Sequence, residues 1–140
     1  MHIAQILADI RQSALSEQEK GRKFERLMQA WLRADSLYAE ELSKVWLWEE
    51  FPAKGQFGGH DLGIDLVART KLGEYWAIQC KFYGENTSID KTSVDSFISN
   101  SSRTFIDPAS GNETSFSARY WISTNDYFNS NAEEIVKNRQ

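Results

Sequence analysis

Three polar residues stand in two short apolar runs whose composition is typical of paired β-strands. Asp65 lies in the run IDLVAR, and Gln79 and Lys81 lie in the run YWAIQCKF. A short turn that contains a glycine joins the runs, so residues 64–82 are predicted to form a β-hairpin. Pairing within this hairpin would bring Asp65 close to the level of Gln79.

Side chains point alternately to the two faces of a strand, so Gln79 and Lys81 are predicted to share one face of the second strand. The opposite face is apolar and carries Trp76, Ile78, Cys80 and Phe82. A lysine ammonium is costly in a buried strand unless a partner neutralises it. Asp65 is the predicted partner. One face of the strand is therefore expected to be apolar and the other to carry the polar side chains that take part in chemistry.

An aspartate, a carboxamide and a lysine at one end of a sheet suit phosphodiester hydrolysis. That reaction needs oxygen ligands for a hard cation such as Mg²⁺, an activated water, and positive charge near the phosphate. We expect Asp65 to hold the metal, with the Gln79 amide oxygen and the backbone carbonyl of Cys80 as further ligands. Lys81 would position the water or offset phosphate charge.

Two helices are predicted ahead of these strands. Residues 1–16 form a short amphipathic candidate, and a stronger one runs from Glu17 to Ala34 with Ser16 as its cap. The second helix has one apolar stripe, made of Phe24, Leu27, Met28, Trp31 and Leu32.

The remaining segments are predicted from their local composition. KVWLWEEF (44–51) is rich in aromatic and β-branched residues and stops at Pro52, which predicts a strand, and the glycine-rich AKGQFGGHDLG predicts a loop. A helix of about twelve residues, capped within Asn86–Ser88, follows the hairpin. A surface loop over 105–117 then precedes a strand at 118–124.

A last helix is predicted from Asn131, and its pattern is still running at Gln140, so we expect the chain to be a fragment. The order of elements predicts an α/β domain, a mixed sheet with helices on its faces. With 140 residues, one domain is expected.

Composition excludes several classes of protein. Cys80 is the sole cysteine and only His2 and His60 accompany it, so neither a disulfide nor a Cys/His zinc site is expected. No apolar run approaches the roughly 20 residues that cross a bilayer. The first residues are unlike a secretion signal, so a cytoplasmic protein is expected.

The net charge of −4 counts against a protein that binds DNA by its own electrostatics. Two explanations stay open. Either another part of a larger protein binds the DNA, or the acidity reflects carboxylates that serve as metal ligands.

The motif G-I-D-L-V-A, a hairpin turn and W-A-I-Q-C-K resembles the D…(D/E)xK signature of restriction-endonuclease-like nucleases, in the Mrr-like variant that has Gln at the middle acidic position. The segment GRKFERLMQAWL resembles the first helix of that branch, which implies a metal-binding role for Glu25. WIST and the Asn-rich segment after it resemble the closing strand and helix. Gln79 removes a negative charge from the site, which Glu25 or Asp61 would have to replace.

The resemblance implies a restriction-endonuclease-like core, α-β-β-β-α-β with an extra N-terminal helix, and a DNA endonuclease that uses Mg²⁺ or, as a substitute, Mn²⁺. Within the Mrr-like branch, the chain is most similar to the N-terminal nuclease of type ISP restriction-modification enzymes. That likeness implies a helicase-like motor, a methyltransferase and a target-recognition domain in the same polypeptide, and a second nuclease copy for double-strand cleavage. The alternatives are a stand-alone Mrr-like nuclease acting on modified DNA, a resolvase, or an inactive docking module.

Other polar residues have simpler interpretations beside the functional ones. Glu25 is either a metal ligand or a solvated helix residue, Asp61 is expected to bond loop amides, and His60 is expected to be a solvated loop residue. The glycine loop, at Gly58 and Gly59, would let backbone approach DNA, and Lys91 is a further candidate DNA contact. Tryptophans at strand positions are expected to be sheet core: Trp46, Trp48, Trp76 and Trp121.

Overall fold

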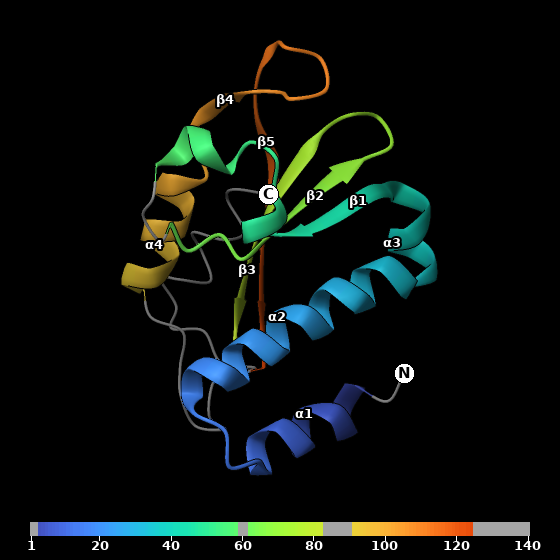
Figure 1. Cartoon of the computed structure of the whole chain (residues 1–140), viewed down its shortest axis with the longest axis vertical. Helices are drawn as coiled ribbons and strands as arrows, with labels where there is room; N and C mark the ends of the chain where they lie inside the picture. The colour runs from blue at the N-terminus through green and yellow to red at the C-terminus, as the bar shows by residue number, and fades with distance from the viewer. Residues whose placement is uncertain (1–2, 59–61, 83–90, 125–140) are drawn as a thin grey trace.

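The protein folds around one sheet with helices against it, as the computed structural model in Figure 1 shows for residues 3–58, 62–82 and 91–124. The helices and strands are α1 (Ile3–Gln12), α2 (Glu17–Ala34), α3 (Ser36–Glu41), β1 (Leu42–Leu47), β2 (Leu66–Thr70), β3 (Tyr75–Lys81), α4 (Lys91–Asn100), β4 (Thr104–Ile106) and β5 (Glu113–Ser123). Two short 3-10 turns, η1 (Trp48–Glu50) and η2 (Lys54–Phe57), lie between β1 and β2.

The five strands form one mixed sheet in the order β1-β2-β3-β5-β4. β1, β2 and β3 pair antiparallel, β3 pairs parallel with β5, and β4 pairs antiparallel with β5. Two parallel neighbours cannot be joined by a tight turn, and the connection from β3 to β5 carries α4. The predicted α/β architecture, a mixed sheet with flanking helices, is therefore confirmed.

Both faces of the central strand β3 are buried. Helix α2, which crosses the sheet in Figure 1, packs on one face, where an apolar cluster includes Phe24, Met28, Leu66, Ile78 and Cys80. A second cluster on the other face consists of Val67, Tyr75 and Ala77 together with aromatic residues from later elements, Phe97, Phe105 and Phe116 among them. The expectation of one apolar and one chemical face was therefore wrong for most of β3, because α4 and these aromatic side chains cover the second face.

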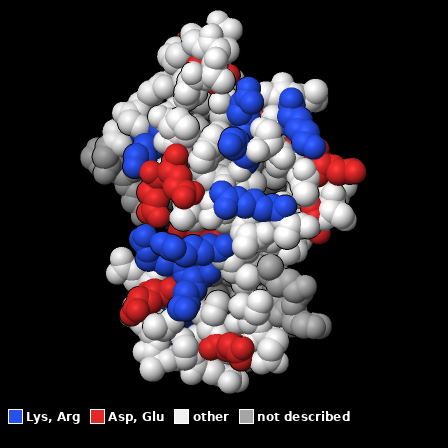
Figure 2. Space-filling view, turned by 45° about the vertical axis from the view of Figure 1, so that its right-hand side comes forward, with Lys and Arg blue, Asp and Glu red and all other residues white. Residues whose placement is uncertain are grey.

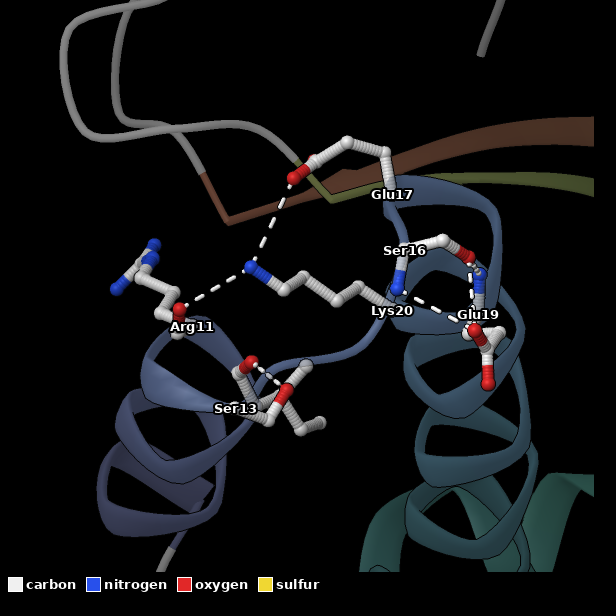
Figure 3. Close-up of polar contacts among 7 residues, drawn as sticks. Arg11, Ser13, Ser16, Glu17, Glu19 and Lys20 are labelled. Atoms are coloured by element: carbon white, nitrogen blue, oxygen red, sulfur yellow. Dashed lines mark hydrogen bonds and ion pairs between the residues drawn. The ribbon is translucent and has the colours of Figure 1, made fainter.

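The predicted second helix is confirmed with the bounds Glu17–Ala34, and its start is fixed by a capping box (Figure 3). The Ser16 hydroxyl accepts a 3.1 Å hydrogen bond from the Glu19 N–H, and the Glu19 carboxylate accepts a 3.3 Å bond from the Ser16 N–H. Lys20 Nζ donates to the Arg11 carbonyl at 3.1 Å, which ties α2 back to the end of α1. Helix α1 ends at Gln12 rather than at residue 16, since Ser16 has the extended backbone of a cap.

The predicted strand over 44–51 was partly wrong. β1 starts at Leu42 and ends at Leu47, and the chain then turns through η1. The Glu50 carboxylate accepts hydrogen bonds from the Leu47 N–H at 2.9 Å and from Gln29 Nε2 at 3.0 Å, which closes the turn. Both hydrogen bonds lower the pKa of the Glu50 carboxyl, and the bond from the Leu47 N–H has the larger effect.

Helix α3 was missed by the sequence reading. It begins because the Asp35 carboxylate accepts hydrogen bonds from the Leu37 and Tyr38 N–H groups at 3.2 and 3.3 Å. Six residues are too few for a periodic apolar pattern to be visible.

The predicted loop over 105–117 was also wrong, because β4 and the first part of β5 form a hairpin there. Asp107 holds its turn by accepting hydrogen bonds from the Ala109 N–H at 2.9 Å and from Tyr75 Oη at 2.7 Å. Phe105 and Phe116 are buried in the second cluster, so the strands are stabilised by packing that the local sequence does not reveal.

Two predictions fall outside the described residues, the caps at Asn86–Ser88 and the helix from Asn131. Among the helices that the structure describes, none is long and apolar enough to cross a membrane. Of the four tryptophans expected in the core, Trp76 is buried, and Trp46, Trp48 and Trp121 are partly buried against the second cluster. Trp48 lies in η1 rather than in a strand.

The capping box makes the first turn of α2 sensitive to one side chain. We predict that Ser16→Ala lowers the free energy of unfolding by about 1 kcal/mol, since the Glu19 N–H loses its acceptor. Chemical denaturation followed by circular dichroism measures this. Ser16→Asp, which keeps an acceptor oxygen, is the matched control and should stay close to the parent. Equal losses in both variants would show that the cap does not set the stability of α2.

Candidate active site

Asp65 lies directly before β2, where three segments of backbone meet. Its N–H donates to the Ile78 carbonyl at 2.9 Å, and its own carbonyl accepts from the Trp48 N–H at 2.9 Å. The Asp65 carboxylate reaches across to β3 and accepts a 2.7 Å hydrogen bond from the Cys80 N–H. Both the main chain and the side chain of Asp65 are thus fixed by neighbouring segments, as the hairpin prediction requires.

The backbone of β3 also aims the Cys80 carbonyl. The N–H and C=O groups of one strand residue point to the same side of the strand. Since the Cys80 N–H donates to Asp65, the Cys80 carbonyl faces the same side, toward β2. The main chain of the next residue, Lys81, faces the other way, and its carbonyl accepts from the Thr124 N–H at 3.2 Å.

Gln79 and Lys81 share one face of β3, as predicted, and their side chains contact each other. With the Gln79 carboxamide nitrogen facing the Gly63 carbonyl, to which it donates a hydrogen bond, the carboxamide oxygen accepts a 3.3 Å hydrogen bond from Lys81 Nζ. Gln79 is only 3% exposed, whereas Lys81 is partly exposed. The buried amide therefore holds the lysine ammonium beside the end of the sheet.

Gly63 is required by this contact. Its φ of +74° is a conformation that side chains disfavour, and a Cβ on it would lie 2.9 Å from the terminal carboxamide atom of Gln79. The glycine of the G-I-D segment thus allows the loop to approach Gln79 closely.

A cleft of about 520 Å³ lies between the first half of α2 and the η1–η2 segment. It is lined by Glu25 and Asp65, together with Arg22, Leu47, Trp48, Glu49, Lys54, Gly55, Gly58 and Ile64. Glu25 comes from a helix and Asp65 from a strand end, so the fold brings together two carboxylates that are distant in sequence.

The Cys80 thiol is influenced by both of these carboxylates. Burial raises its pKa well above the ordinary value, and the charges of Asp65 and Glu25 raise it further. The thiol is therefore held protonated at neutral pH, so it is not available as a thiolate ligand.

The possible metal donors are oxygen atoms. Among the described residues, no group of three or more His, Cys, Asp or Glu side chains is arranged to hold a metal ion. The cleft lining supplies two carboxylates, and a backbone carbonyl and an amide oxygen from β3 would complete a hard donor set, the kind that Mg²⁺ prefers. The residues present fit a hard divalent cation, and the roles of Glu25, Asp65, Gln79 and Cys80 as ligands stay predictions.

The other candidate residues are distributed differently. Gly58 lines the cleft and has a φ of 79°, so it needs to be glycine. Gly59, His60 and Asp61 lie outside the described residues. Lys91 begins α4 and forms a 2.6 Å ion pair with Asp95, so it belongs to that helix rather than to the cleft lining.

Sequence reasoning missed three charged residues of the cleft, Arg22, Glu49 and Lys54. Arg22 had one available signal, because it lies three positions before Glu25 and hence on the same side of α2. The sequence gives no such signal for Glu49 and Lys54, because their positions in the cleft depend on the turns η1 and η2, which were not predicted. On the face shown in Figure 2, Lys and Arg side chains are interleaved with Asp and Glu, rather than forming an unbroken cationic surface.

Comparison with known proteins adds family information to this geometry. Residues 33–140 match an Mrr-type family model described as "Restriction endonuclease", a range that includes Asp65, Gln79 and Lys81 but not Glu25. Among curated proteins, none matches the sequence significantly.

One solved structure is similar over almost the whole chain. It is described as "ATP-dependent Type ISP restriction-modification enzyme LlaBIII bound to DNA", with 28% sequence identity and a TM-score of 0.66. The match covers 94% of this chain and 7% of that one, so the present chain spans a small part of the larger enzyme's length. The family match over most of the chain, together with this fold, shows that the protein belongs to the Mrr-type restriction endonuclease family.

Proposed function

We propose that this chain is a Mg²⁺-dependent DNA endonuclease domain and the cleavage module of a type ISP restriction-modification enzyme. The observation that carries the proposal is the meeting of Glu25 and Asp65 in one cleft, with Asp65 fixed by the Cys80 N–H at 2.7 Å. The likeness to a type ISP enzyme described as bound to DNA supports the choice of substrate.

Each residue has a distinct task under this proposal. Glu25, Asp65 and the Cys80 carbonyl would hold the metal, and the Gln79 amide oxygen has a second lone pair to add to its bond from Lys81. When bound, Mg²⁺ supplies positive charge to the phosphate oxygens and makes a water more acidic. The Lys81 ammonium, oriented by Gln79, would hold the attacking water or neutralise charge on the phosphate.

The proposed partners follow from the same likeness. DNA is the substrate, and a helicase-like motor, a methyltransferase and a target-recognition domain of the same polypeptide would deliver the nuclease to it. One such site cuts one strand, so a double-strand break would use a second copy of the nuclease.

We predict that Asp65→Asn and Lys81→Met each reduce DNA cleavage by the full-length enzyme on the order of 10²-fold or more, because the first removes a proposed metal-binding charge and the second removes a cation proposed to act at the reacting phosphate. Plasmid cleavage with Mg²⁺ measures this, and ATP hydrolysis reports whether the rest of the enzyme is intact. Cys80→Ala keeps the backbone carbonyl, and Lys71→Met removes an exposed lysine at the β2–β3 turn. Both controls should still cleave. Near-parental cleavage by either test variant would refute the assigned site.

We predict opposite effects of Gln79→Glu on metal binding and on stability. A carboxylate ligand should tighten Mg²⁺ binding. The same change removes the donor to the Gly63 carbonyl in a buried place, which should cost about 1–3 kcal/mol of unfolding free energy without metal. Calorimetric titration and metal-dependent thermal melts measure the two effects. Weaker metal binding in this variant would argue that Gln79 does not face the metal.

We also predict that the 140-residue chain alone binds duplex DNA weakly and without sequence preference at physiological salt. Its 16 basic side chains are outnumbered by 20 acidic ones, and those visible in Figure 2 are interspersed with carboxylates. Fluorescence anisotropy with duplexes of different sequence tests this. Tight, sequence-selective binding would favour a self-sufficient endonuclease.

A further inference from the structure

Glu49 lies between two cations in the cleft that contains Glu25 and Asp65. Its carboxylate is 3.3 Å from Arg22 Nη2, and its main-chain carbonyl accepts a 2.7 Å hydrogen bond from Lys54 Nζ. Arg22 comes from α2 and Lys54 from η2, so Glu49 joins the two walls of the cleft.

The Arg22–Glu49 ion pair is poorly placed to stabilise the fold. The two side chains are 53% and 51% exposed, and ion pairs of that kind contribute little to stability because solvent screens them. The turn that carries Glu49 is instead closed by its neighbour Glu50, through the bonds from Leu47 and Gln29. The carboxylate of Glu49 is therefore not needed for the local structure.

The net charge of the cleft decides whether it attracts or repels an incoming anion such as a phosphate. Among the described residues that line the cleft, Arg22 and Lys54 contribute two positive charges and Glu25, Glu49 and Asp65 contribute three negative ones, which leaves a net charge of −1. A divalent cation on Glu25 and Asp65 would change that sum to +1. Displacement of the Glu49 carboxylate from Arg22 would then leave a guanidinium ready for a second anion, beside the metal.

We propose that Arg22 and Lys54 bind backbone phosphates that flank the scissile phosphate, and that Glu49 occupies Arg22 until DNA displaces it. The inference rests on the proposed nuclease function. A guanidinium binds carboxylate and phosphate oxygens with the same geometry, so one can replace the other. Arg22 lies one helical turn from Glu25, with Cβ atoms about 5–6 Å apart, so its phosphate lies next to the one at the metal.

The wall opposite α2 contains two glycines, which add no side chain to the cleft. Gly55 and Gly58 line it, and a Cβ built on Gly55 would meet nothing within 4 Å. The backbone of η2 is therefore open to approach on the side of the cleft where Lys54 lies.

The test measures binding of a fluorescein-labelled duplex to the 140-residue chain by anisotropy, over a salt series that starts at low ionic strength. Ca²⁺ replaces Mg²⁺ so that the DNA is not cut. The variants are Arg22→Gln, Lys54→Gln, Glu49→Gln and the double variant Arg22→Gln/Glu49→Gln. Lys23→Gln is the matched control, an exposed cation of the same helix that does not line the cleft.

Arg22→Gln and Lys54→Gln should each weaken binding and lower the slope of log affinity against log salt by about 0.9, the amount for one phosphate contact. Glu49→Gln should tighten binding several-fold, and much less in the Arg22→Gln background, because Glu49 acts through Arg22. Thermal melts should stay unchanged, since the ion pair is half-exposed. Lys23→Gln should have a clearly smaller effect on the slope.

Equal salt slopes for Arg22→Gln and Lys23→Gln, no gain of affinity in Glu49→Gln, or no binding by the parent at low salt would each overturn the phosphate site. Cleavage by the full-length enzyme with Mg²⁺ is scored separately. If the binding results hold and the parent enzyme does not cleave, the phosphate site stands and the proposed nuclease function fails. If the parent enzyme cleaves but the binding results do not hold, only the phosphate site fails.

Discussion

The hydrogen bond from the Cys80 N–H to the Asp65 carboxylate is the interaction on which the candidate site depends. At 2.7 Å it joins the end of β3 to the residue before β2, and the Asp65 main chain is held at the same time by Ile78 and Trp48. A carboxylate that accepts a backbone N–H is well oriented, because the donor cannot move without the strand. Strand geometry places the Cys80 carbonyl on the same side of β3 as this N–H, so two oxygen donors lie on the side that faces β2.

This contact places the site where two packed layers meet. Helix α2 covers one face of the sheet and brings Glu25 to the cleft, whereas Gln79 and Lys81 belong to the other face. Asp65, directly before β2, is the residue that links the two. The buried Gln79 is satisfied by Gly63 and Lys81, so the polar end of the second face is stabilised without breaking the aromatic cluster beneath it.

Much of this arrangement was predictable because it depends on local rules. The bounds of α2 follow from its apolar stripe and from Ser16, and the shared face of Gln79 and Lys81 follows from strand alternation. The β4–β5 hairpin was not predictable, because the turn-forming residues around Asp107 conceal strands that are stabilised by burial of Phe105 and Phe116 far along the chain. The end of β1 at Leu47 was missed for a related reason, since the Glu50 side chain closes the turn. With that turn misplaced, the positions of Glu49 and Lys54 in the cleft could not be foreseen.

The acidity of the domain is consistent with a cleavage module whose DNA is delivered by other parts of an enzyme. Strong binding by free cations would let such a module engage any duplex, because phosphate contacts carry no sequence information. Among the described residues that line this cleft, the carboxylates exceed the cations by one, and Arg22 is paired with Glu49. Under the proposed function, a divalent metal ion would reverse that balance, and a phosphate could then replace Glu49 on Arg22. Weak intrinsic affinity would then be a property of the site itself, because the Asp65 and Glu25 carboxylates proposed to bind the metal would also repel DNA when no metal is present.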